Sequence, residues 1–268
     1  MRMKTIVFDG RSFAETKKEE LKIVVNGLRS RGIVPHLASI LIGNDPASRL
    51  YVGLKKKAAE TLGAELDPYY LPESVKLEEV FMLIDSLNTD ANIQGVMVQL
   101  PIPGELGNHK KEILDVIDSK KDVDGLKKDS NFLHPTSKAA IDILHTAEHE
   151  LKIMKKGIVA VVGSTGMVGS SLVKELKVEG YEVIECNKKT KDLGKHTVLA
   201  DIVISATGHP SLIMGDMVKD GVILIDVGSP KADFSPVAQD KSVFFTPVPG
   251  GVGPVTIACL LENLVEAC

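Results

Sequence analysis

The sequence has little of several residue types, and each shortage excludes a class of protein. It contains no tryptophan, only 4% aromatic residues, and a net charge of −4 with a pI near 6.0. A general nucleic-acid or membrane-surface binder would be basic, so we expect neither nucleic acid nor membrane as a partner. No apolar run is long enough to cross a bilayer, and no secretory signal opens the sequence.

Cysteine and arginine are also scarce. The three cysteines, Cys186, Cys259 and Cys268, are odd in number, far apart, and without the paired spacing of a metal site. We therefore expect free thiols, a reducing and cytoplasmic compartment, and no metal. All five arginines precede residue 50, so any anion bound by later segments must use lysine or backbone N–H groups.

Apolar runs bounded by turn residues alternate with helical patterns along the 268 residues. The patterns predict strands at 37–43, 66–71, 93–103, 200–208 and 221–228, and helices at 44–63, 74–88, 109–118 and 136–148. A strand, a glycine turn, a helix and another strand follow within 155–186, and a rigid loop leads into a terminal helix within 246–267. Such alternation indicates parallel sheets covered on both faces.

A lysine-rich join around residues 150–157 suggests an α/β protein of two lobes, with the ligand cleft between them. We predict an N-terminal α/β catalytic domain at 1–135, completed by the C-terminal helix at 252–268. A Rossmann-like dinucleotide-binding domain with a parallel sheet is predicted at 136–251.

The segment "VAVVGSTGMVGSSL" places Gly163, Gly166 and Gly169 between a strand and a helix. Glycine lets the backbone approach a phosphate, and the free N–H groups and dipole of a helix N-terminus favour negative charge. The spacing is G-x-x-G-x-x-G instead of the usual G-x-G-x-x-G, so a tight turn without a ligand is the alternative. Lys188 and Lys189 follow the next strand and could attract a 2′-phosphate, which favours NADP, or could form a solvated loop.

Tyr51 and Lys55 are four residues apart, so on a helix they share one face with Ala58 and Leu62. A lysine among apolar and aromatic neighbours loses hydration, its pKa falls, and it can act as a base. The alternative is a lysine that lies along the surface with its ammonium in water.

Three further segments carry residues that favour a site. Gln99 stands at the carboxyl end of a predicted buried strand, where ligands of open α/β sheets bind. Asp122 and Asp124 lie in the loop "KDVDG", although Asp-Gly is also a common turn. In "TPVPGGVGPVT", two prolines fix the path and three glycines allow close approach to a ligand or another element.

Together these residues match a known family. The motifs "FDGRSFAE", "SRLYVGLKKKA", "GVMVQLPIP", "KDVDG", "VVGSTGMVGSSL" and "TPVPGGVGPVT" occur in this order over nearly the whole chain. The sequence resembles the bifunctional methylenetetrahydrofolate dehydrogenase/methenyltetrahydrofolate cyclohydrolases. The resemblance implies hydride transfer from 5,10-methylenetetrahydrofolate to NADP, with NAD as the alternative. It also implies hydrolysis of the methenyl product to 10-formyltetrahydrofolate, a role in one-carbon metabolism and purine biosynthesis, and a homodimer.

The resemblance also implies roles for individual residues. Lys55 would carry the proton during hydration, Gln99 would hydrogen-bond Lys55, Asp124 would hold the pterin-like end of the folate, and Tyr51 would border its ring. The substrate-binding set would be Tyr51, Val52, Lys55, Val98, Gln99, Leu100, Asp124, Pro249, Gly250, Gly251 and Gly253. The cofactor-binding set would be Gly163, Ser164, Thr165, Gly166, Val168, Gly169, Lys188, Lys189 and Ser229.

The sequence departs from the family mainly on the cofactor side. Ser164-Thr165 replaces the usual Arg-Ser, Ser171 replaces a proline, Lys188 replaces the ribose-side serine, and Ser229-Pro230 replaces an Ile-Asn type pair. The segment between "DVDG" and "HPTSKAA" is short and lacks the usual Asn-Gly and Pro-Cys-Thr-Pro pattern. Lysine offers a point charge where arginine offers a bidentate fork, so these changes bear on cofactor preference.

Three alternatives stay open from the sequence. The chain could be a cyclohydrolase with a weak or lost dehydrogenase, or a folate-binding protein without turnover. It could also be an unrelated nicotinamide dehydrogenase, which would make the motifs of the first lobe coincidental.

Overall fold

The structure is a computed structural model that describes residues 5–268. The chain forms two compact units. The lysine unit, named for Lys55, comprises Glu15–Pro135 and Ile257–Cys268. The glycine-turn unit comprises the residues up to Ala14 together with Thr136–Thr256.

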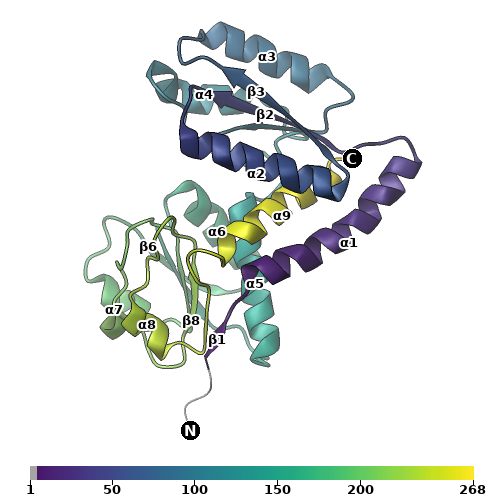
Figure 1. The fold of residues 1–268 in the computed structure, drawn as a ribbon. Helices are drawn as coiled ribbons and strands as arrows, with labels where there is room; N and C mark the ends of the chain where they lie inside the picture. Colours follow the sequence, from purple (N-terminus) through teal and green to yellow (C-terminus); the bar gives the residue numbers. More distant parts are fainter. Residues whose placement is uncertain (1–4) are drawn as a thin grey trace. The chain divides into compact units, whose positions relative to one another are not determined.

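The lysine unit is built on a three-stranded parallel sheet with the strand order β3-β2-β4. Its strands are β2 (His36–Ile42), β3 (Glu65–Leu71) and β4 (Gly95–Val98). One face of the sheet packs against α1 (Gly10–Ser30), α2 (Pro46–Leu62) and α9 (Val252–Glu266). The other face packs against α3 (Leu77–Thr89), η1 (Glu105–His109) and α4 (Lys110–Val116). Figure 1 shows α2 and α3 on opposite sides of this sheet.

Local sequence explains where α2 begins and ends. The carboxylate of Asp45 accepts a hydrogen bond from the backbone N–H of Ser48 at 2.7 Å, and Pro46 occupies the first turn. Gly63 ends the helix in the left-handed region with φ 86°, where a side chain would be strained. These caps fix the position of the tyrosine and lysines that lie between them.

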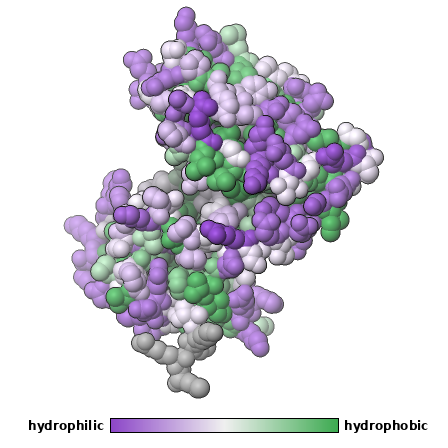
Figure 2. All heavy atoms as spheres, in the orientation of Figure 1, coloured by the Kyte–Doolittle hydropathy of each residue, from purple (hydrophilic) through white to green (hydrophobic). Residues whose placement is uncertain are grey.

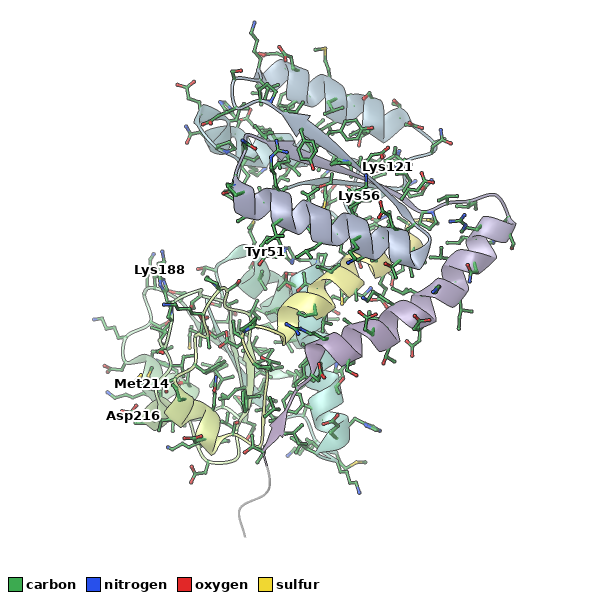
Figure 3. All side chains as sticks on the ribbon, in the orientation of Figure 1. Tyr51, Lys56, Lys121, Lys188, Met214 and Asp216 are labelled. Carbon is green, nitrogen blue, oxygen red and sulfur yellow. The ribbon has the colours of Figure 1, made fainter. Side chains whose placement is uncertain are left out.

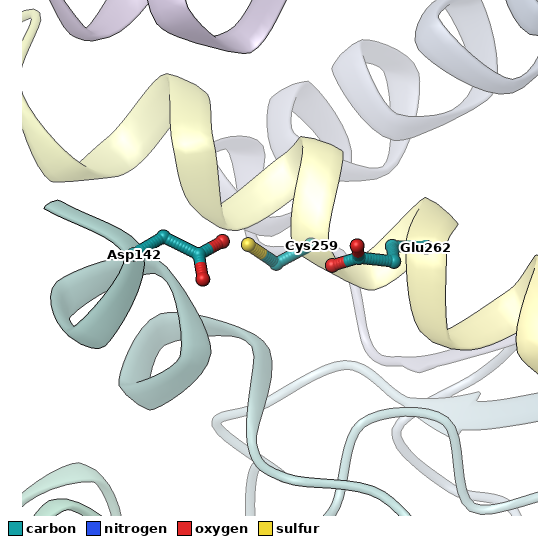
Figure 4. A group of neighbouring side chains, drawn as sticks. All are labelled: Asp142, Cys259 and Glu262. Carbon is teal, nitrogen blue, oxygen red and sulfur yellow. The ribbon is translucent and has the colours of Figure 1, made fainter. Parts of the chain in front are cut away.

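Helices α1 and α9 are joined by an ion pair within the lysine unit. Figure 4 shows Cys259 and Glu262 one turn apart on α9. The Glu262 carboxylate lies 2.8 Å from the ammonium of Lys17 on α1. All three cysteines are free thiols, with Cys186 and Cys259 buried.

The glycine-turn unit contains a six-stranded parallel sheet with the order β1-β9-β8-β7-β5-β6. Its strands are β1 (Ile6–Val7), β5 (Ile158–Val162), β6 (Glu182–Cys186), β7 (Ile202–Ser205), β8 (Ile223–Asp226) and β9 (Phe244–Phe245). Its helices are α5 (Pro135–Glu150), α6 (Met167–Val178), α7 (Leu193–Thr197), η2 (Gly215–Met217) and α8 (Pro236–Lys241).

The strand order of this sheet reverses beside β5. From β5 the chain continues to β6 on one side, and β7 then lies on the other side of β5. Ligands of open α/β sheets bind outside the carboxyl ends of the strands at such a reversal. Two α/β units with parallel sheets confirm the predicted fold class.

The surface carries apolar side chains as well as charged ones. Figure 2 shows hydrophobic residues scattered among hydrophilic ones over the visible face of each unit. Among residues 5–268, no helix combines the length and the apolar character that crossing a membrane requires.

Candidate active site

Lys55 lies one turn after Tyr51 on α2, and its side chain reaches the sheet. Its Nζ donates a hydrogen bond to Oε1 of Gln99 at 2.9 Å and lies 3.7 Å from Sδ of Met97. Burial lowers the pKa of Lys55, whereas the negative charge of Asp124 acts in the opposite direction. A lysine with a lowered pKa gives up its proton more readily than an exposed one.

Gln99 directly follows β4 and is held at both ends of its amide. Its Nε2 donates to the carbonyl of Leu100 at 3.0 Å, while its oxygen accepts from Lys55. Because side chains alternate along a strand, Met97 and Gln99 face α2, whereas Val98 packs into the core on the α3 side. Any contact of Val98 with a ligand would therefore come from its backbone.

The three lysines of α2 differ in their surroundings. Lys55 and Lys56 are half-buried and Lys57 is exposed. Tyr51 is 46% exposed and Val52 is buried in the core beneath α2. Figure 3 shows Tyr51 and Lys56 on this helix. Among these, Lys55 has the hydrogen bond to Gln99.

The loop after α4 places Asp124 within electrostatic reach of Lys55. Asp122 is buried, and it builds the turn: its Oδ2 accepts from the N–H of Lys127 at 2.9 Å, and its carbonyl accepts from the N–H of Gly125 at 3.0 Å. Burial raises the pKa of Asp122. Of the two predicted aspartates, Asp122 therefore shapes the loop and the half-buried Asp124 is the one whose charge reaches the lysine.

His134 belongs to the same cluster, although no motif in the sequence indicates it. Burial lowers the pKa of His134; the charge of Asp124 raises it and that of Lys55 lowers it further. The ring is thus close enough to both groups to respond to each. The sequence offers one weak signal, which is a histidine directly before Pro135, immediately after the segment that departs from the family pattern.

The glycine turn lies between β5 and α6. Gly163 has φ +90°, and a Cβ on Gly169 would lie 2.1 Å from the carbonyl oxygen of Gly163, so only glycine fits at Gly169. Gly166 precedes α6 without a side-chain cap, which leaves the N–H groups of the first turn of α6 open to an anion. The Oγ of Ser164 is buried and has no hydrogen-bond partner among the described residues. These features fit a phosphate group of a dinucleotide.

The other predicted cofactor residues lie at the same edge of the sheet. The carbonyl of Cys186, at the end of β6, accepts from the N–H groups of Gly163 and Ser164 at 2.9 and 3.0 Å. Lys188 and Lys189 follow within the next three residues and are exposed, and Figure 3 shows Lys188 at the surface of this unit. The remaining predicted residues are Thr165, exposed, Val168, half-buried, and Ser229, exposed after β8.

Asp233 is a second residue of a predicted site that no sequence motif indicates. It is fully buried, and its Oδ2 accepts from the hydroxyl groups of Ser205 and Thr207 at 2.7 and 2.8 Å. It also accepts from the N–H groups of Thr207 and Gly208 at 3.0 and 3.2 Å. A single buried carboxylate thus holds the loop after β7, directly beside the glycine turn at the reversal of strand order.

The segment "PVPGGVGP" is partly explained by packing within the glycine-turn unit. Gly250 has φ +104°, and a Cβ on Gly251 would lie 2.6 Å from the carbonyl oxygen of Pro247. Pro249 and Gly253 are exposed, and a Cβ at Gly253 would meet nothing within 4 Å. Close packing therefore accounts for Gly251 and leaves Pro249 and Gly253 without a structural reason.

Comparison with known proteins decides the family. Residues 8–124 match the family model described as "Tetrahydrofolate dehydrogenase/cyclohydrolase, catalytic domain". Residues 134–268 match the model of the NAD(P)-binding domain of the same family. The chain belongs to this family. The bifunctional protein FolD of Lactobacillus helveticus is 38% identical over 275 residues, which cover 97% of this chain and 96% of that protein.

Two solved structures of family members have the same fold. The bifunctional FolD of Campylobacter jejuni is 39% identical with a TM-score of 0.90 and covers 98% of both chains. The FolD of Trypanosoma brucei, solved with an NADP cofactor and an inhibitor, is 31% identical with a TM-score of 0.90 and covers 100% of this chain and 98% of that one.

Membership confirms the predicted family and its bifunctional dehydrogenase and cyclohydrolase character, with a folate substrate and a nicotinamide cofactor. It removes the unrelated nicotinamide dehydrogenase from consideration. The roles of individual residues stay predictions.

Proposed function

We propose that this chain oxidises 5,10-methylenetetrahydrofolate with NADP and hydrolyses the methenyl product to 10-formyltetrahydrofolate, with Lys55 as the proton carrier. The observation that carries the proposal is the 2.9 Å hydrogen bond between Lys55 Nζ and Gln99 Oε1 at a site where burial lowers the pKa of the lysine. The amide oxygen fixes the position of the nitrogen whether that nitrogen is charged or neutral.

The folate would be bound by residues around this amine. The Asp124 carboxylate offers two acceptor oxygens for the N–H groups of the pterin ring, and the half-exposed ring of Tyr51 offers a surface for stacking. The backbone of Val98, the residue Leu100 and Val52 beneath α2 complete the part of the proposed substrate set that lies in the lysine unit. Pro249, Gly250, Gly251 and Gly253 belong to the glycine-turn unit, and the family resemblance alone assigns them to the same set.

The cofactor would be held by the glycine-turn unit. The N–H groups at the start of α6, with the Ser164 hydroxyl beside them, would bind its phosphates. When bound, the nicotinamide supplies the hydride acceptor for the oxidation. The chain's own contribution is the fixed loop after β7, which Asp233 holds by four hydrogen bonds.

NADP preference is proposed from Lys188 and Lys189, which follow β6 where the adenosine ribose of such folds is bound. We expect Lys188→Ala to weaken NADP binding by about tenfold, because one charged contact to the 2′-phosphate is lost. NAD binding should not change, since NAD lacks that phosphate. Isothermal titration of the wild type and the variant with NADP and with NAD measures both dissociation constants.

Lys195→Ala is the matched control, because the Lys195 amine pairs with Asp192 at 2.8 Å and has a role of its own. This control should bind both cofactors like the wild type. A wild-type protein that binds NAD as well as NADP, with no effect of Lys188→Ala, would contradict the proposed preference.

The full reaction separates the remaining alternatives. We expect purified protein with methylenetetrahydrofolate to form the methenyl compound with NADP. If the methenyl compound forms with neither NADP nor NAD, the protein has no dehydrogenase activity and is a cyclohydrolase only. If the protein also opened the methenyl compound no faster than buffer, it would be a folate-binding protein without turnover.

Three coarser expectations accompany this function. We propose a homodimer, a cytoplasmic location and a contribution of the 10-formyl product to purine biosynthesis. We also propose that the functional domains follow the predicted division, with folate chemistry in 1–135 and 252–268 and cofactor binding in 136–251.

A further inference from the structure

The hydrolysis creates a proton that the buried lysine cannot keep. When water adds to the methenyl carbon, a C–O bond forms and the oxygen loses one proton. When the ring opens, the bond between this carbon and N5 breaks, the oxygen loses its second proton to become a carbonyl, and N5 keeps the electron pair and takes up one proton. Two protons leave the oxygen and one returns to the product, so one proton is released in each turnover.

Lys55 can take a proton from the water and give one to N5, but the net proton must still leave the site. The amine is bound to Gln99, whose amide oxygen accepts hydrogen bonds but is not a base. Asp124 has a charge that would stabilise a passing cation, and the role proposed for it is to bind the pterin ring. Among the described residues, His134 is a further titratable group that responds to the charges of both Lys55 and Asp124.

The backbone holds His134 against the loop that carries Asp124. Gly125 has φ +61°, and a Cβ on it would lie 2.6 Å from the backbone nitrogen of His134. The side-chain amide of Asn263 on α9 donates to the carbonyl of Val123 and to that of Leu133, at 2.9 Å each. Asn263 therefore ties the residue before Asp124 to the residue before His134, and Gly125 brings the two backbones into close approach.

The surroundings suit the ring for accepting a proton. Burial and the charge of Lys55 keep the pKa of His134 below its ordinary value of 6.5, so the ring is neutral near neutral pH and can accept. The half-buried residue keeps part of its surface open to solvent, and Asp124 raises its pKa. A protonated imidazole whose pKa is lowered releases its proton to water more readily than an ordinary one.

We propose that His134 is the outlet through which the net proton of the hydrolysis passes from Lys55 to solvent. This proposal rests on the proposed role of Lys55. His134 does not touch the reacting atoms in this account; it acts through the lysine. The hydride transfer moves no proton, so the dehydrogenase step should not depend on it.

The test compares the two half-reactions in His134→Gln, with His134→Asn as a second variant of different length. We expect hydrolysis of methenyltetrahydrofolate to slow by about tenfold. A group that transfers the proton directly contributes about a hundredfold or more, so the effect of His134 should be smaller than that of Lys55. Methenyl formation should keep its wild-type rate. Imidazole added to the buffer should restore hydrolysis in the variants and leave the wild type unchanged.

Controls separate this inference from the function on which it rests. His109→Gln changes an exposed histidine of the same unit that pairs with Glu112, and both activities should stay normal. The proposed outlet would be overturned if both His134 variants hydrolysed the substrate at the wild-type rate without imidazole. It would also be overturned if both activities fell equally. Lys55→Met measured in parallel tests the lysine: hydrolysis retained in that variant would contradict the proposed function itself.

Discussion

We expect Lys55→Met to reduce the hydrolysis of methenyltetrahydrofolate by at least about a hundredfold, the usual contribution of a positioned acid or base. Methionine resembles the lysine stem in length but has no proton to exchange. The fold should persist, because the change removes a buried ammonium whose lowered pKa opposes folding. Thermal unfolding near neutral pH should therefore show a midpoint that is unchanged or higher.

The sign of that stability effect follows from the direction of the shift. The folded state holds the pKa of Lys55 below 10.5, so between the lowered pKa and 10.5 the unfolded chain binds more protons, and stability rises with pH. Lys55→Met should remove that part of the slope. Lys57→Met is the control, because Lys57 is exposed on the same helix, and it should keep both activities. Near-normal hydrolysis in Lys55→Met would show that a group other than Lys55 carries the proton.

We expect Gly169→Ala to abolish tight binding of the nicotinamide cofactor. The new methyl group would lie 2.1 Å from the carbonyl oxygen of Gly163, so the turn or the helix must move. Such overpacking typically costs about 1–3 kcal/mol of stability. The dissociation constant of NADP should rise by about tenfold or more, because the N–H groups proposed to bind its phosphates are displaced. Isothermal titration with NADP and thermal unfolding measure the two effects.

Gly27→Ala is the matched control for this substitution. A Cβ on Gly27, an exposed position of α1 outside the proposed sites, would meet nothing within 4 Å. Cofactor binding should therefore not change. Equal binding by Gly169→Ala and the wild type would show that the phosphates are not held at this turn.

Much of the fold follows from local signals in the sequence. The pattern predicts a helix at 44–63, and the observed helix spans 46–62 between an aspartate cap and a final glycine. Buried strands such as 36–42 are recognised as apolar runs because they are covered on both faces. The helix at 10–30 was not predicted, although its 21 residues carry a strong amphipathic pattern.

The site is predicted less completely, because its members come from separate segments. Lys55 and Gln99 are 44 residues apart, and only the family resemblance brings them together before the structure is seen. His134 and Asp233 gain importance from contacts across loops, which no local pattern records. Val98 illustrates the reverse: its place beside Gln99 suggests a site residue, but alternation along the strand directs its side chain into the core.

The most direct test is an NMR titration of the Lys55 side chain in the wild-type protein, with its signal assigned by its absence in Lys55→Met. The account predicts a pKa below 10.5, and a pKa that moves with the loss of the Asp124 charge in Asp124→Asn. A Lys55 that titrates at or above 10.5 would be an ordinary solvated ammonium, and it would contradict the claim that this amine carries the proton.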